Sequence, residues 1–331
     1  MIVFYLAALL ADFLAPYDYR AQSKLEPMAP PSQIRFRDDQ GHWHLRPFIY
    51  SRKIVDPLRR IYEEDTSTPY SLILFARGYS YKLFGLIATD LHLFGVSGPD
   101  QPASPRLYLL GTDNSGRDRL SRLLIAARFS LLVGPLATLL ASALGILIGC
   151  IAGYSGRLID SLLMRAADVT MALPNLVMVL AARAAFPLEL PPSSAIFMIV
   201  AIFAALGWAQ MARLARGEVM SLGQRDFVLA AYSLGLTRRT ILFRHILPNM
   251  SRPLLAQTTI MLPAFLLTET TLSFLGVGLQ EPEPSWGNML TAASDITLLA
   301  SQPFVLLAPA FAIFFFVLGV RLFSNGLQSF R

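Results

Sequence analysis

The sequence predicts an all-α polytopic membrane protein with about six transmembrane helices and a small mixed external subdomain. Of its 331 residues, 54% are hydrophobic and only 15% are charged, whereas soluble domains carry about 25% charged residues. The charge is concentrated in residues 17–128 and 213–252 and is nearly absent from several long runs elsewhere. This distribution favours lipid as the solvent around much of the chain.

Five stretches are long and apolar enough to cross a bilayer, which takes roughly 20 such residues. They are residues 129–152, 166–186, 194–214, 253–276 and 303–321. A sixth stretch, from Ile2 to Leu14, is shorter and is interrupted by Asp12. Because no basic residue precedes it, a signal peptide is the less favoured interpretation, and we expect a first transmembrane helix there.

The charges between these spans predict the side that each loop occupies. Residues 213–252 carry seven arginines against two acidic residues, whereas the connection 277–302 carries three acidic residues and no basic one. By the positive-inside rule, the first segment and the C-terminus are cytoplasmic and the connection is external. Six helices then place residues 17–125 outside, where a long loop can be translocated regardless of its charge.

Residues 226–249 form the most informative cytoplasmic stretch. Apolar side chains recur at helical spacing on both sides of Gly235, which predicts two short helices with a break at the glycine. Thr237 can cap the second helix, and Pro248 should end it because proline lacks the amide donor. The small residues let a partner surface approach closely, although a basic amphipathic loop lying on anionic lipid fits the residues equally well.

This loop resembles the coupling-loop motif of ABC importer permeases, in which Glu-Ala-Ala, three residues and Gly precede His-x-Leu-Pro by about nine residues. Leu229 stands where the motif has glutamate, but Leu247 and five other positions fit the spacing. The resemblance implies a type I ABC importer permease fold and an ATPase-coupling site. The coupling residues that we expect are Phe227, Ala230, Ala231, Gly235, Arg238, Arg239, His245 and Pro248.

Other segments are similar to dipeptide and oligopeptide permeases. Leu110–Arg122 resembles the segment before their second helix, and Glu269–Gly278 resembles a later landmark. The insert Trp43–Val96 looks like that of the microcin C and peptide importers of the Yej type. The expected parts are a first transmembrane helix (1–16), an external insert with the pre-helix segment (17–125), and a core permease domain with five transmembrane helices (126–331) and a coupling loop (215–250).

Two local features have more than one interpretation. In the insert, two short strands around a turn at residues 76–78 are predicted within a mixed subdomain over residues 35–100, which could meet a substrate-binding protein or pack only on itself. Glu269 lies inside the fifth predicted span, where an ionisable group is a functional candidate or a hydrogen-bonded brace between helices. Gly145 and Gly149 form a G-x-x-x-G that permits close helix contact.

The sequence predicts no catalytic centre, cofactor or metal site. No lysine follows a glycine, so the phosphate-binding loop G-x-x-x-x-G-K-[ST] is missing. The single cysteine, Cys150, lies in an apolar run and is interpreted as a small buried hydrophobe. The His42-x-His44 pair is too small a ligand set for zinc. Any nucleotide hydrolysis must therefore come from another polypeptide.

Together with the resemblance, these observations predict a permease subunit of an ATP-driven peptide importer in the inner membrane of a bacterial cell. The family implies a second homologous permease, two ABC ATPase subunits and a peptide-binding protein as partners, and no nucleic acid. The alternative is an ion-coupled secondary transporter, which should show internal repeats; the sequence has no convincing repeat. A membrane scaffold without transport is a third possibility.

Overall fold

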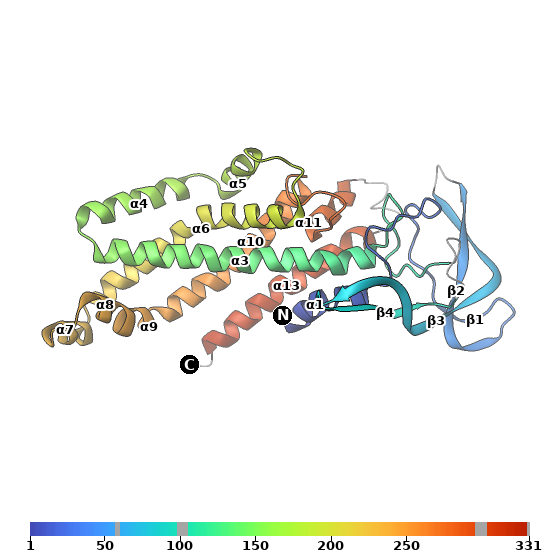
Figure 1. Ribbon diagram of the computed structural model, residues 1–331, viewed down its shortest axis with the longest axis horizontal. Coiled ribbons are helices and arrows are strands. Elements are labelled where there is room, and N and C mark those ends of the chain that lie inside the picture. Colours follow the sequence, from blue (N-terminus) through green and yellow to red (C-terminus); the bar gives the residue numbers. More distant parts are fainter. Residues whose placement is uncertain (57–59, 98–104, 295–302, 330–331) are drawn as a thin grey trace. The chain divides into compact units, whose positions relative to one another are not determined.

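The polypeptide is mostly helical and carries one antiparallel sheet (Figure 1). The computed structural model describes residues 1–56, 60–97, 105–294 and 303–329. The chain divides into two compact units: unit 1 is residues 1–130 with 281–316, and unit 2 is residues 131–280 with 317–331. Two long helices, α3 (Arg119–Tyr154) and α13 (Phe304–Ser329), each contribute residues to both units.

Unit 1 is held together by an aromatic cluster. The rings of Phe4, Trp286 and Phe316 meet edge to face, with centroids 5.8 to 6.4 Å apart, and the indole of Trp286 donates to the Leu123 carbonyl at 3.2 Å. Edge-to-face pairs add to the stabilisation from burial. The helical elements of this unit, besides parts of α3 and α13, are α1 (Ile2–Leu9), α2 (Ala11–Leu14), α11 (Trp286–Met289) and the 3-10 helix η2 (Leu290–Ser294).

The insert of unit 1 forms a four-stranded antiparallel sheet in the order β1-β2-β3-β4. Its strands are β1 (Arg35–Arg37), β2 (Trp43–Asp56), β3 (Ile61–Leu83) and β4 (Ile87–Val96). In the part of 35–100 that the structure describes, the expected mixed subdomain is therefore wholly β. The predicted turn at residues 76–78 is also wrong: Ala76 and Arg77 stay paired with β4, and a register shift before Tyr81 absorbs the irregularity.

Unit 2 is a bundle of helices in close contact. Its elements, besides parts of α3 and α13, are α4 (Arg157–Ala172), α5 (Asn175–Ala184), α6 (Pro192–Gly223), α7 (Asp226–Ser233), α8 (Arg238–Ile241), the π-helical segment η1 (Leu242–Ile246), α9 (Leu247–Asn249) and α10 (Ser251–Phe274). A Cβ on Gly145 would lie 2.5 Å from Met211 Cβ, and one on Gly149 would lie 2.4 Å from the Ala212 carbonyl oxygen. The predicted close helix contact at these glycines is confirmed.

Three helical segments of the described chain are long and apolar enough to span a membrane: α3, α6 and Leu307–Gly326 of α13. Helices α4 and α5 qualify only as a pair, bent by 91°, because the chain between them passes through Pro174. The predicted span 166–186 is therefore broken. Helix α10 is long enough, at about 36 Å, but its threonines and Glu269 lower its hydropathy. The count of six spans is not reproduced.

Candidate functional site

The predicted coupling loop begins with α7, which ends in a Schellman motif at Gly235. The Leu236 amide donates to the Ala231 carbonyl at 3.2 Å, and the Gly235 amide donates to the Tyr232 carbonyl at 3.0 Å. Gly235 has φ +78°, the left-handed conformation that this cap requires and that glycine adopts without steric cost. The predicted break at the glycine is therefore confirmed, and its cause is a backbone cap.

The second half of the loop starts as expected but continues further than expected. Thr237 caps α8, because its Oγ1 accepts from the Thr240 amide at 3.3 Å. Pro248, however, does not end the helix: the chain passes through the π-helical segment η1 into α9. A π-segment shifts the hydrogen-bond pattern by one residue, and proline is tolerated in the first turn of α9, where its missing amide leaves no bond unmade.

The predicted coupling residues divide between a buried and an exposed face. Ala231 is buried, with 4% of its surface exposed, and His245 is half-buried. The exposed members are Phe227, Ala230, Gly235, Arg238, Arg239 and Pro248. Helical spacing predicts one shared face for Phe227, Ala230, Ala231 and Leu234. The structure splits this face, because Val228, and not Phe227, turns inward beside Ala231.

The buried face joins the loop to three long helices within unit 2. Val228, Ala231, Ile241 and Ile246 belong to one apolar cluster with Met211 and Ala215 of α6, Cys150 of α3 and Leu254 of α10. Such a cluster is close-packed, so a displacement of the loop is transmitted to the helices that it contacts. Cys150 is a buried free thiol and acts here as an apolar packing residue.

The exposed face combines apolar and cationic side chains. Leu234 is 82% exposed, Phe243 is 67% exposed and Phe227 is 43% exposed. In the described part of the chain, no carboxylate forms an ion pair with Arg238 or Arg239. This surface offers apolar area and positive charge to a partner that carries acidic groups.

Two ion pairs stabilise the helices next to the loop. Arg216 of α6 makes a two-point contact with Asp160 of α4, and Arg213 Nη1 lies 3.2 Å from Asp168 Oδ1. These arginines contributed to the cytoplasmic assignment of residues 213–252. The structure shows that they also connect α4 to α6.

Glu269 on α10 is fully buried and accepts a hydrogen bond from Ser273 Oγ at 2.7 Å. The donor is one turn further along the same helix, so this contact is local to α10. The hydrogen bond to Ser273 lies within α10 and does not itself join two helices, so the two interpretations of Glu269, a functional group and an interhelical brace, both stay predictions.

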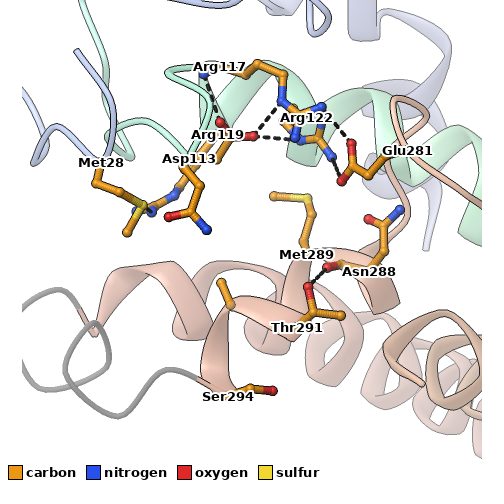
Figure 2. Close-up of a pocket in the computed structure, with 12 residues that line it drawn as sticks. Met28, Asp113, Arg117, Arg119, Arg122, Glu281, Asn288, Met289, Thr291 and Ser294 are labelled. Atoms are coloured by element: carbon orange, nitrogen blue, oxygen red, sulfur yellow. Dashed lines mark hydrogen bonds and ion pairs between the residues drawn. The ribbon is translucent and has the colours of Figure 1, made fainter. Parts of the chain in front are cut away.

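A second polar group, absent from the predicted site residues, lies in unit 1. A cavity of 410 Å³ separates residues 113–122 from α11 and η2 (Figure 2). Its lining residues are Met28, Asp113, Asn114, Arg117, Arg119, Arg122, Glu281, Asn288, Met289, Thr291, Ala292 and Ser294. The charged members come from the segment predicted as a landmark before the second helix and from the acidic connection.

One carboxylate at this cavity is held by two arginines. Arg117 Nη1 donates to Glu281 Oε2 at 2.6 Å, and Arg122 Nη2 donates to Glu281 Oε1 at 2.8 Å. Asp113 Oδ2 accepts from Arg117 Nε at 2.6 Å. We call Asp113, Arg117, Arg122 and Glu281 the Glu281 clamp. Sequence reasoning missed it because Arg117 and Glu281 are 164 residues apart; the only signal was the opposite charge of their segments.

Asp118 lies beside this clamp and precedes α3. Its Oδ2 accepts from the amide and the hydroxyl of Ser121, at 2.8 and 2.6 Å, so it caps the first turn of the helix. Burial raises the pKa of the Asp118 carboxyl to about 6, because desolvation disfavours the charged form. A buried titrating carboxyl thus lies at the start of a spanning helix.

The fold and the loop together define a class, that of helical membrane components of transport systems. The chain belongs to the family of binding-protein-dependent transport system inner membrane components, which it matches over residues 145–330. This range includes the whole coupling loop and leaves out the sheet. The chain is therefore a multi-pass membrane transport component, and the predicted resemblance to ABC importer permeases is confirmed.

Individual proteins are also similar to this chain. The oligopeptide transport system permease protein OppC of Bacillus subtilis (strain 168) is 34% identical over 239 residues, which are 72% of this chain and 75% of that protein. The dipeptide transport system permease protein DppC of Alkalihalophilus pseudofirmus is 36% identical over 221 residues, 67% and 70% of the two chains. A solved amino acid ABC transporter has a TM-score of 0.48 at 18% identity and covers 62% of this chain and 92% of its own.

Proposed function

We propose that this chain is one permease subunit of an ATP-driven peptide importer in the inner membrane of a bacterial cell. The relatives named oligopeptide and dipeptide permeases support peptides as the cargo, since each shares at least 34% identity over two thirds of this chain or more. The proposed cargo is an oligopeptide or dipeptide, with a microcin C-like peptide as the alternative.

The observation that carries the coupling role is the two-faced loop at residues 226–249. Its inner face packs on α6 and α10, and its outer face exposes Phe227, Leu234, Arg238 and Arg239. Among the residues that the structure describes, no carboxylate forms an ion pair with either arginine. An ATPase subunit with an apolar groove and acidic rim fits this outer face. In the complete importer, each of two permeases presents such a loop to one of two ATPases.

Transport follows from the connection between the two faces. When ATP closes the ATPase pair, the loops move, and the shared apolar cluster carries that motion into α6 and α10. The pathway lies between this chain and a second, homologous permease. A peptide-binding protein delivers cargo from the side on which the insert lies, and the loop faces the cytoplasm, as the arginine excess of residues 213–252 predicts.

The test replaces an exposed apolar residue of the loop. Leu234→Asp places a carboxylate where the partner surface should be apolar, so we expect retention of the ATPase by tagged permease to fall at least about tenfold, equivalent to about 1.4 kcal/mol. Retention is measured by co-purification from detergent, and ATP-dependent peptide uptake is measured in liposomes.

The matched control is Leu45→Asp, at a leucine of the insert sheet that is fully exposed. It should leave ATPase retention unchanged, because it lies in a different unit from the loop. Normal retention and uptake by the Leu234→Asp protein would show that the outer face is not the docking surface.

A further inference from the structure

The turn between β3 and β4 exposes three adjacent apolar side chains. Leu86 is 86% exposed, Ile87 is 59% exposed and Phe84 is 51% exposed. From Lys82 to Thr89 the chain carries no acidic residue. We call residues 84–87 the hairpin tip. Contiguous exposed apolar groups at the end of a rigid hairpin are typical of an interaction site.

The backbone of the hairpin tip is not the one that its sequence favours. Phe84 has φ +54° and Gly85 has φ +73°, and the Leu86 amide donates to the Leu83 carbonyl at 3.1 Å. A tight turn of this kind favours Asn or Gly at its first central position, and a bulky residue with positive φ is uncommon. The phenylalanine is therefore not explained by the needs of the turn.

The hairpin is attached to the N-terminal helices within unit 1. His92 Nδ1 of β4 lies 2.9 Å from the Asp12 carbonyl oxygen, and the rings of Phe13 and Phe75 lie 6.3 Å apart. In Figure 1 the end of β3 reaches back from the sheet toward α1. Helix α1 itself exposes apolar side chains, with Ile2 at 77% and Val3 at 75%.

A neighbouring ion pair lies next to the start of the apolar run of α3. Arg128 Nη2 pairs with Asp12 Oδ2 at 2.7 Å, and the apolar run of α3 begins at the next residue, Phe129. Tyr79 and Tyr81 lie against His92, with ring centroids 4.6 and 5.1 Å away. Tyrosines gather at the headgroup level of membrane proteins, so this level is the expected boundary between lipid and water.

We infer that the hairpin tip is inserted into the bilayer and anchors the insert sheet to lipid. From His92, at the boundary, five strand residues carry the chain about 17 Å to Ile87, enough to reach acyl chains. Lys82 can extend its ammonium to the phosphate level. Lipid fits better than a protein groove, because the tip is apolar, lies in the same unit as the exposed apolar side chains of α1, and offers no charged group to specify a protein partner. The inference rests on the proposed function at one point: the proposed orientation puts the insert outside the cell, and therefore puts the hairpin tip in the outer leaflet.

The test uses a cysteine probe in the complete complex. In a Cys150→Ala background, which keeps this buried position apolar, Leu86→Cys is labelled with an environment-sensitive fluorophore (nitrobenzoxadiazole) and reconstituted into liposomes with spin-labelled phosphatidylcholine. We expect blue-shifted emission and the loss of about half of its intensity to the lipid quencher. Leu45→Cys, on β2, is the matched control and should show water-like, unquenched emission.

Two results would overturn the anchor. Water-like emission from Leu86→Cys means that the hairpin tip is in solvent, and blue-shifted emission without quenching means that protein covers it. Peptide uptake is measured on the same liposomes, which separates the two proposals. Uptake without quenching rejects the anchor alone, and quenching without uptake supports the anchor while rejecting the transport role.

Discussion

At the scale of single residues, Gly235 links local geometry to docking. A Cβ at this position meets nothing within 4 Å in the chain, yet φ is +78°, so substitution is opposed by the backbone and not by crowding. We expect Gly235→Ala to destabilise the cap by about 1 kcal/mol and Gly235→Asn to cost less, because asparagine tolerates this conformation.

The measurement is limited proteolysis of the loop together with ATPase co-purification. If the backbone conformation at Gly235 controls docking, the Gly235→Asn protein should be more resistant to proteolysis and should retain more ATPase than the Gly235→Ala protein. If close approach of the partner is decisive, Asn keeps the loop protected but loses the ATPase more completely than Ala. Identical behaviour of both variants and the parent protein would contradict the role of the cap.

Asp118 gives a prediction about pH. Its folded pKa of about 6 lies above the ordinary value of 3.8, so between about pH 4 and 6 the folded chain holds a proton that the unfolded chain releases. Stability therefore falls as pH rises through this window, by about 3 kcal/mol in total at about 1.4 kcal/mol per pKa unit.

Asp118→Asn removes the titrating group while keeping its shape. The free energy of unfolding in mixed micelles, followed from pH 4 to 7, should then lose this part of its pH dependence. Asp39→Asn, at a carboxylate that is 51% exposed, is the control and should leave the slope in place. An unchanged slope in the Asp118→Asn protein would refute the assignment.

At the scale of elements, the Glu281 clamp ties the segment before α11 to the start of α3. The Arg122 side chain is only 4% exposed, whereas that of Glu281 is 54% exposed. Glu281→Gln leaves a buried cation with a weaker partner, and we expect a loss of about 2 kcal/mol, below the cost for a fully buried pair.

Glu283→Gln provides the comparison within the same segment. Its partner Arg20 is 56% exposed, so its loss should cost less than about 1 kcal/mol. Thermal unfolding in detergent measures both. Combining Glu281→Gln with Arg122→Met should recover part of the loss, because the buried charge is then gone; equal effects of the two glutamine variants would argue against the clamp.

Local pattern predicted the elements of the coupling loop well and their continuation poorly. The cap at Thr237 and the break at Gly235 depend on neighbours in sequence, so they could be predicted. The π-helical segment before Pro248 follows Ile241 and ends at Ile246, which both pack in the buried cluster with other helices, and no local pattern contains those contacts. Likewise, the irregularity predicted as a turn at residues 76–78 became a bulge because β4 supplied hydrogen bonds across it.

At the scale of the whole molecule, composition and charge predicted a helical membrane protein, and the motif predicted its family. The number of spans was harder to predict from hydropathy. A hydropathy profile does not show the 91° bend between α4 and α5, and it does not distinguish a polar spanning helix from a buried helix of a soluble protein. The Glu281 clamp could not be predicted from the sequence, since it joins segments far apart along the chain. Which distant residues meet becomes known only once the fold is known.

The division of the coupling loop into two faces has an evolutionary consequence. Val228 and Ile241 must fit the helices of their own chain. Phe227 and Leu234 lie only a few residues from them in the sequence, but in the proposed complex they must fit the surface of the ATPase, which another gene encodes. Neighbouring codons are thus under selection from separate sources. A permease could exchange its motor by drift at the outward positions while its interior remained unaltered.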